Sequence, residues 1–467
     1  MKTESPVVAN TSTPRSLTYL LMFTVFYIPN QRIFPDFSLT GVNITNLLFI
    51  AILALIIRNK KRDHTPAPLK KQFIFYFLIL TWGFLIGQAY DMSRLFADFQ
   101  ALKNAVLYML LFFLAYYAVQ DTKTIKLLFL TILFTVFFDT YLGLRQVLDY
   151  GLGYNEARRV AAPFSWNSTD ANRSAAYYTV YLIPLAATAL YYRSSRLVRW
   201  GALACAVFVI FVNFFTYSRQ SYGIITVLLL TLTMRRNVLL GFLIIVALFN
   251  YHAWLPDSVI QRIDMTVTTN DAMPGVVAAP LTKELDDSTE SRFIIWSGAG
   301  QIVEHNPWGI GFNHFGRNIG TYAPAYTNYD AHNYFILTTT ENGILAPVAL
   351  LLLLLGLFRL GRNVEQLKNG SDAKVYGVAL WLGVVAVAMV NIYGSRFVDG
   401  NLMSNFWIFA GLVTRYRVIQ MQAMGQSQVT TGTPVRVARA KNRSPIRARR
   451  SAGAMHHCQD QGFPVIS

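Results

Sequence analysis

Apolar runs that are long enough, or nearly long enough, to cross a lipid bilayer recur along this chain of 467 residues. About 20 apolar residues span the hydrocarbon core of a membrane. Only 14% of the residues are charged, against roughly a quarter in a soluble domain. The sequence therefore predicts an all-α integral membrane protein with about twelve transmembrane helices, at 17–31, 42–57, 72–89, 104–119, 125–144, 174–192, 198–217, 220–234, 237–253, 333–358, 375–393 and 402–416.

Basic residues are distributed unevenly over the segments between these runs. The formal net charge is +17, which in a soluble protein would suggest a nucleic-acid partner. If the first run starts inside, the inner segments hold 28 of the 41 Lys and Arg but only 6 of the 24 Asp and Glu. Lys and Arg are retained on the cytoplasmic side of membrane proteins. We therefore expect cytoplasmic N- and C-termini and no nucleic-acid partner.

The runs divide the chain into four parts. Residues 1–253 hold the first nine predicted spans, and 333–419 hold the last three. Between them, 254–332 forms one long outer loop with nine acids and four basic residues, and we expect it to contain short helices and the chemistry. Residues 420–467 are basic and lack apolar periodicity, which predicts a disordered cytoplasmic tail that could contact membrane lipid.

Several classes of chemistry have no support in the sequence. Cys205 and Cys458 are too few for a disulfide framework or a zinc site. No G-x-x-x-x-G-K-[ST] phosphate loop and no H-E-x-x-H or paired-cysteine motif occurs. We therefore expect neither a cofactor nor a metal, and any donor substrate should arrive within the membrane.

Arg219 lies in the hinge TYSRQ between two apolar runs, on the predicted outer side. A cation there opposes the inside bias of basic residues, and an arginine near membrane depth needs a partner or an aqueous cavity. One reading is a side chain that reaches the membrane interface. The other is an anion clamp, since a guanidinium donates two parallel hydrogen bonds to a phosphate.

The segment DSTESRFIIWSGAGQIVEHNPWGIGFNHF, residues 287–315, predicts a helix on the outer side. Asp287 or Ser288 can cap it, and Phe293, Trp296, Ala299 and Val303 recur at helical spacing. Asn306-Pro307 ends it before a glycine turn. We expect an interfacial helix with an aromatic face against the bundle. Arg292 in its first turn could bind an anion, or it could pair with Glu290 or Asp287.

The sequence YDAHNYF, residues 329–335, stands where the long loop enters the tenth run. A histidine at the top of a helix can accept a hydroxyl proton near neutral pH, although a lone histidine is more often structural. His332 is therefore a candidate base, whereas His305 and His314 receive no role. Glu341 is expected to be a buried structural carboxylate.

As a set, the S-R hinge, the R-F-x-x-W helix with N-P-W-G-I-G-F, and A-H-N-Y-F with the later E-N-G resemble the O-antigen ligase superfamily, which includes polysaccharide polymerases. The resemblance covers roughly residues 160–360. Asp170-Ala171-Asn172-Arg173 resembles the asparagine-containing element of that family.

The resemblance implies a GT-C-like, metal-independent membrane glycosyltransferase of lipopolysaccharide or polysaccharide biosynthesis, located in the bacterial inner (plasma) membrane. Its members transfer a glycan from undecaprenyl diphosphate to an acceptor hydroxyl at the periplasmic face. Arg219 and Arg292 would bind the donor diphosphate, and His332 would orient or deprotonate the acceptor. Asn172, Arg173 and Asn333 are implied as further donor or acceptor contacts.

Two alternatives to a ligase acting on lipid A-core remain. A polymerase of the same superfamily would use a second lipid-linked glycan as acceptor; the R-x10-G pattern of such polymerases is absent after Arg158, Arg159, Arg262, Arg292 and Arg317. A transporter of lipid-linked sugars would need polar groups at mid-membrane, where Asp139 is the main candidate.

Overall fold

The computed structural model describes residues 12–35, 38–39, 42–59, 62–264, 267–268, 284–285, 287–367 and 370–430. The described residues up to Gln422 form one compact unit. This unit holds every predicted span and every candidate site residue.

The described residues are mainly helical. The α-helices before the long loop are α1 (Arg15–Tyr27), α2 (Ile44–Arg58), α3 (Lys70–Tyr90), α4 (Leu95–Ala118), α5 (Thr122–Tyr150), α6 (Ala171–Tyr191), α7 (Arg196–Phe214), α8 (Arg219–Arg236) and α9 (Val238–Phe249). Those from the loop onward are α10 (Asp257–Asp264), α11 (Asp287–His305), α12 (Phe315–Tyr322), α13 (Tyr334–Asn342), α14 (Ala346–Glu365), α15 (Gly370–Val390) and α16 (Gly400–Thr430).

Short elements join these helices. The 3-10 turns are η1 (Gln31–Ile33), η2 (Met92–Arg94), η3 (Glu156–Arg158), η4 (Ser168–Asp170), η5 (Tyr251–Ala253) and η6 (Pro324–Tyr326). The strands are β1 (Ser38–Leu39), β2 (Val42–Asn43), β3 (Val267–Thr268) and β4 (Glu284–Leu285). β1 pairs antiparallel with β2, and β3 with β4.

Six stretches of helix are long and apolar enough to cross a membrane: 70–90, 92–118, 122–150, 196–214, 346–365 and 370–390. They coincide with six of the twelve predicted spans, which supports the prediction of an α-helical membrane protein. Each of the remaining runs also contains a helix, but α1, α2 and α9 have only 13, 15 and 12 residues.

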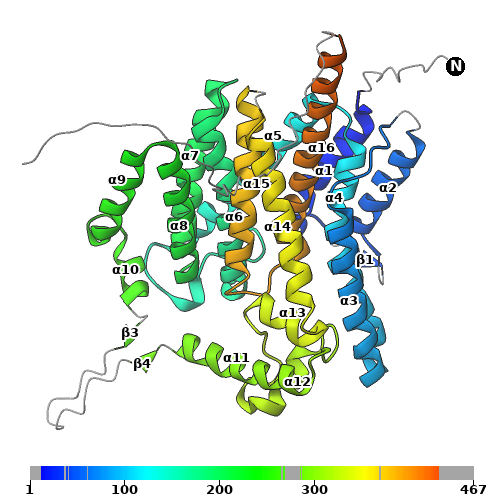
Figure 1. The fold of residues 1–467 in the computed structure, drawn as a ribbon. Coiled ribbons are helices and arrows are strands. Elements are labelled where there is room, and N and C mark those ends of the chain that lie inside the picture. The colour runs from blue at the N-terminus through cyan, green and yellow to red at the C-terminus, as the bar shows by residue number, and fades with distance from the viewer. Residues whose placement is uncertain are drawn as a thin grey trace, which may run out of the picture. The chain divides into compact units, whose positions relative to one another are not determined.

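The long helices stand side by side as a bundle, and α11 and α12 lie across one end of it (Figure 1). Near its centre, α15 packs against both α14 and α6. Most of the apolar part of α15 is buried, and buried aromatic residues such as Trp407, Tyr177 and Tyr376 fill the space around it. The bundle thus supplies a rigid support for the segments at its ends.

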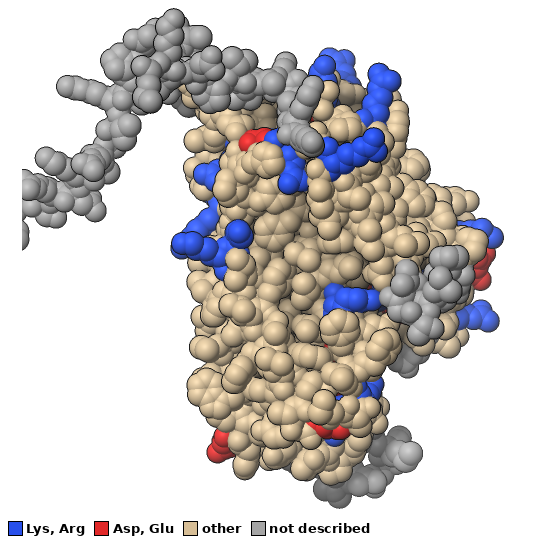
Figure 2. Space-filling view, turned by 90° about the vertical axis from the view of Figure 1, so that its right-hand side faces the viewer, with Lys and Arg blue, Asp and Glu red and all other residues tan. Residues whose placement is uncertain are grey.

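Basic side chains gather toward the end of the bundle opposite α11 and α12 on the face shown in Figure 2, and uncharged residues cover most of the region between the ends. Apolar side chains such as Leu78 of α3, Phe134 of α5 and Leu351 of α14 are exposed. A broad uncharged belt is what the hydrocarbon of a membrane requires.

The predicted tenth span, 333–358, is wrong as a single helix. The chain breaks into α13 and α14 at Gly343, whose φ is +86°. Gly309 and Gly343 approach each other there, and Ile344 N–H donates to the Pro307 carbonyl at 3.0 Å. Apolar composition carries no sign of the break, although Asn342-Gly343 is a turn signal and Pro347 stands at the start of α14.

The tail also differs from its predicted start at 420, since α16 continues to Thr430. Arg415 anchors this helix: Nε donates to the Val119 carbonyl at 2.8 Å and Nη1 to Asp63 Oδ2 at 2.8 Å. Gln422 Nε2 also donates to Asp63, at 3.0 Å. The rest of the predicted tail, 431–467, lies outside the described residues.

Candidate functional site

The hinge between α7 and α8 is held by small polar side chains. Ser221 Oγ lies 2.6 Å from Asn213 Oδ1 and 2.7 Å from the Ser218 carbonyl. Asn213 Nδ2 in turn donates to the Ala175 carbonyl of α6 at 3.1 Å. Tyr217 takes a positive φ of 51°, which reverses the chain. The hinge therefore places Arg219 at the first residue of α8, beside α6.

Arg292 extends from the first turns of α11 toward α8. The side-chain amide of Gln220 is oriented with its oxygen toward Arg292. That oxygen accepts hydrogen bonds from Arg292 Nη1 and from Arg292 Nη2, the second at 2.9 Å. Arg292 Nε is buried without a hydrogen-bond partner among the described residues. An arginine that keeps a buried donor unused is suited to a ligand with several acceptor oxygens.

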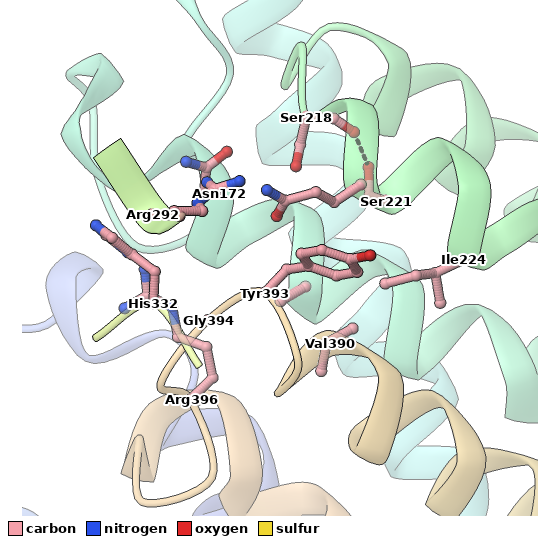
Figure 3. A pocket seen from close by; sticks show the side chains of 12 residues that line it. Asn172, Ser218, Ser221, Ile224, Arg292, His332, Val390, Tyr393, Gly394 and Arg396 are labelled. Atoms are coloured by element: carbon pink, nitrogen blue, oxygen red, sulfur yellow. Dashed lines mark hydrogen bonds between the residues drawn. The ribbon is translucent and has the colours of Figure 1, made fainter. Parts of the chain in front are cut away.

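Arg292 and His332 line one pocket, which encloses about 430 Å³ including space open to solvent. The wall is built from α6, α8, α11, the turn before α13 and the loop after α15 (Figure 3). Its lining residues are Asn172, Ala176, Ser218, Gln220, Ser221, Ile224, Arg292, His332, Val390, Tyr393, Gly394 and Arg396. Segments far apart in the sequence thus meet at one cavity.

Arg219 is flanked by two of the lining residues, Ser218 and Gln220, but is not itself among them. Burial lowers the pKa of the Arg219 guanidinium, and the positive charges of Arg262, Arg292 and Arg159 lower it further. Burial likewise lowers the pKa of Arg292. The lining residues, all in the described part of the chain, include no acid. The site is therefore strongly cationic and favours an anion of more than one charge.

His332 occupies a left-handed backbone position, with φ +49°. Its backbone N–H donates to Asp330 Oδ2 at 3.2 Å, and its ring Nδ1 lies 3.6 Å from the same oxygen. Burial lowers the pKa of the imidazole, Asp330 raises it, and Arg292 and Arg396 lower it again. The net shift is downward, so the ring is mainly neutral at pH 7 and can accept a proton.

Of the three further contacts expected from the resemblance, only Asn172 lines the pocket. Arg159 holds it, with Nη2 donating to Asn172 Oδ1 at 2.8 Å. Arg173 instead forms a two-point ion pair with Asp399, with Nη2 to Oδ1 at 2.7 Å. Arg173 therefore links α6 to the start of α16 and does not line the pocket, and its expected role as a substrate contact stays a prediction.

Asn333 also has a structural position. Its Oδ1 accepts hydrogen bonds from the N–H groups of Phe335 at 2.9 Å and Ile336 at 3.2 Å. This is an N-cap, which satisfies backbone donors at the start of α13. Asn333 is buried and does not line the pocket, and its predicted role as a substrate contact stays a prediction.

Nine of the twelve lining residues are not among those that the sequence predicts, and they include Arg396, Gln220 and Tyr393. Arg396 carries the same signal that singles out Arg219, because it is a cation on the predicted outer side. Its N–H donates to Asn391 Oδ1 at 2.9 Å, which fixes the loop after α15. Gln220 and Tyr393 carry no comparable signal, since neither residue type is unusual at the end of a membrane helix.

Two other titratable residues outside the pocket have structural partners. His314 is buried and its Nε2 lies 3.0 Å from Asp98 Oδ2. Glu341 is buried too, and its Oε1 accepts from the Phe315 N–H at 3.1 Å. Both therefore have the structural positions expected from the sequence.

The predicted face of α11 agrees with the buried one at Ala299 but not at Phe293. Ile295, Ala299 and Ile302 are its buried apolar residues, whereas Phe293 is 54% exposed. Trp296 is partly buried and its Nε1 donates to the Ala331 carbonyl at 2.8 Å. The helix thus packs mainly through aliphatic residues, and Trp296 fixes the turn that carries His332.

Among the described residues no group of three His, Cys, Asp or Glu side chains could hold a metal ion. Comparison of the sequence with models of known protein families and with curated proteins finds no match.

Proposed function

We propose that the protein is a membrane glycosyltransferase that transfers a glycan from a polyprenyl diphosphate, undecaprenyl diphosphate, to an acceptor hydroxyl. One observation carries the proposal: Arg292 and His332 line one cationic pocket, and Arg219 is close enough to Arg292 for the charge of Arg292 to lower its pKa. A diphosphate and a base for a hydroxyl are the two requirements of this reaction. The resemblance to the O-antigen ligase superfamily rests on the same residues.

In the proposed reaction the acceptor oxygen attacks the anomeric carbon of the donor sugar. The bond between that carbon and the diphosphate oxygen breaks, and the proton of the acceptor hydroxyl passes to the neutral ring of His332. Negative charge grows on the departing diphosphate, where Arg219 and Arg292 stabilise it. A fixed donor aimed at such developing charge typically contributes about 3 to 4 kcal/mol to catalysis.

The proposal includes a membrane arrangement. All twelve apolar runs cross the inner membrane, both termini lie in the cytoplasm, and the 254–332 loop lies in the periplasm with the pocket. The excess of basic residues on one side supports this orientation. The six helices of sufficient length and apolarity support the membrane assignment itself.

For the acceptor, we favour the lipid A-core, which makes the protein an O-antigen ligase. A polymerase would use the same pocket and add the glycan to a second lipid-linked chain. Removal of the protein from its host separates the two. A ligase defect leaves lipopolysaccharide without long chains while lipid-linked polymer accumulates, whereas a polymerase defect leaves single lipid-linked repeats. An unchanged surface glycan contradicts both.

Replacement of Arg292 by alanine tests the role of the pocket. We expect transfer to acceptor by the purified, reconstituted protein to fall roughly 10²- to 10³-fold, as when one oxyanion donor is removed. Arg145, an exposed arginine of α5 on the predicted outer side, gives the matched control Arg145→Ala. Full transfer by the Arg292 variant would contradict the proposed role of Arg292 in binding the donor diphosphate. If the wild-type protein moves lipid-linked glycan across the membrane but transfers none of it to acceptor, the result would favour a transporter instead.

A further inference from the structure

A second cavity lies at the opposite end of α15 from the candidate functional site. It encloses about 720 Å³ including open space, and its lining includes Leu190, Tyr191, Arg193, Arg236, Ser371 and Lys374. These residues come from the end of α6 and the segment after it, the end of α8 and the start of α15. The proposed transfer reaction uses none of them.

The second cavity concentrates positive charge. Within the described part of the chain, no ion pair includes Arg193, Arg236 or Lys374, and all three side chains are exposed. The ring of Tyr191 lies 4.7 Å from Lys374 Nζ and 5.9 Å from Arg236 Cζ, which brings two of the cations to one aromatic face. The three charges are therefore available to an anion.

Two acids lie nearby, and neither lines the cavity. Asp372 accepts hydrogen bonds from Ser194 at 3.4 Å and from Ser371 at 3.3 Å. Glu365 pairs with Arg235 at 2.9 Å and with Arg362 at 3.0 Å. Glu365 is thus already balanced by two other arginines, and Asp372 alone does not neutralise three cations.

The ends of α15 place the cavity at a membrane surface. This helix has 21 residues, which corresponds to roughly 30 Å at 1.5 Å per residue, about the thickness of the hydrocarbon core. Gly370 at its start lines the second cavity, whereas Val390 at its end lines the candidate functional site. Both α15 and α14, which packs against it, are long and apolar enough to cross a membrane. In a membrane the two cavities would therefore lie at opposite faces of the bilayer.

We propose that this second cavity binds the phosphate headgroup of an anionic phospholipid of the surrounding membrane. Arg193 and Arg236 can each donate two parallel hydrogen bonds to a phosphate, and Lys374 adds a third charge. Leu190 and the ring of Tyr191 offer apolar surface beside the charges. Basic pockets between membrane helices on the cytoplasmic side are known to suit such headgroups. The site does not depend on the proposed transfer reaction.

The test measures lipid binding to the full-length protein, purified in a neutral detergent, by titration with tetraoleoyl cardiolipin and native mass spectrometry. The triple variant R193Q/R236Q/K374Q should bind cardiolipin roughly 100-fold more weakly, because each substitution removes one attractive interaction between a basic side chain and the anionic lipid. Dioleoyl phosphatidylcholine should be retained by neither protein. The matched control R58Q/K70Q/K71Q removes three exposed cations from α2 and α3 and should keep wild-type affinity.

Equal cardiolipin binding by the wild type and the triple variant overturns the proposal, and so does an equal loss in the control. Inorganic phosphate is the third probe: if it displaces cardiolipin at comparable concentration, the cavity is a site for the free anion and the lipid assignment is wrong. Should the triple variant not fold, Lys374→Glu alone reverses one exposed charge and should still weaken binding roughly tenfold or more.

Discussion

His332 lies between a carboxylate and two guanidinium groups, and their opposing effects set its pKa. Asp330 raises the pKa, whereas burial, Arg292 and Arg396 lower it. The lowered pKa means that the ring loses its proton below the ordinary value of about 6.5. A proposed base of this kind is active in its neutral form, so activity should rise with pH through the folded-state pKa and level off above it.

Removal of the carboxylate tests this arrangement. Asp330→Asn deletes the one influence that raises the pKa of His332, so the acid limb of the pH profile for kcat/KM should move to lower pH. The measurement is glycan transfer by reconstituted protein between about pH 4.5 and 8, a range that brackets the ordinary histidine value. His332→Gln serves as the comparison and should lose most activity at every pH. An acid limb that stays in place in the Asp330 variant contradicts the assignment of His332 as the titrating base.

Residue identity alone predicts part of the pocket. Arg219 and Arg292 stand out because a cation on the outer side opposes the usual distribution, and in the structure Arg292 contacts Gln220, the residue that follows Arg219. Arg173 carries the same signal but pairs with Asp399, and nothing in the sequence links these two positions. Charge location therefore identifies candidates, whereas their partners depend on the packing of distant helices.

At the scale of elements, the segment after α11 docks onto the break between α13 and α14. Ile310 N–H donates to the Thr340 carbonyl and Gly311 N–H to the Glu341 carbonyl, each at 3.0 Å. Phe312 N–H donates to the Gly83 carbonyl of α3 at 3.0 Å. The sequence predicts the glycine turn after Pro307. Apolar composition does not show the break at Gly343, although Asn342-Gly343 is a turn signal. The docking of the two turns on each other is not predictable, because it depends on contacts between segments far apart in the sequence.

Gly343→Ala should destabilise this junction. A Cβ at Gly343 would lie 2.8 Å from the carbonyl carbon and oxygen of Trp308, and the φ of +86° is already unfavourable for alanine. We expect a loss of about 1 to 3 kcal/mol in the free energy of unfolding, measured as a lower melting temperature in detergent. Gly223→Ala in α8, where a Cβ meets nothing within 4 Å, is the control and should not lower it. Equal melting temperatures would contradict the close packing at the junction.

At the scale of the whole molecule, hydrophobic composition predicts the helical membrane fold because the bilayer demands long apolar helices with satisfied backbone groups. The order in which the helices pack is not predictable in this way. For example, α15 contacts α6 and α14 at once, although α6 lies far from α15 in the sequence. Which helices pack together depends on how well their side chains fit, and apolar content alone does not determine this fit.

The proposed orientation can be tested with single cysteines introduced into a variant that lacks Cys205 and Cys458. His64 and Ala325 are exposed, in segments predicted on opposite sides of the membrane. In intact cells whose outer membrane has been made permeable, an impermeant maleimide should label Ala325→Cys but not His64→Cys. Disruption of the inner membrane should expose His64→Cys as the positive control. The reverse labelling pattern would invert the proposed topology.

The gathering of Arg159, Arg262 and Arg292 around Arg219, beside one pocket, has an evolutionary consequence. Like charges held together in a partly desolvated space weaken the folded protein. Replacement of one arginine by a neutral residue would relieve that repulsion, so selection for robustness alone favours its loss. Under the proposed function, the demand for binding the donor diphosphate opposes that loss. At this pocket, the stability of the folded protein and its proposed activity therefore favour different residues.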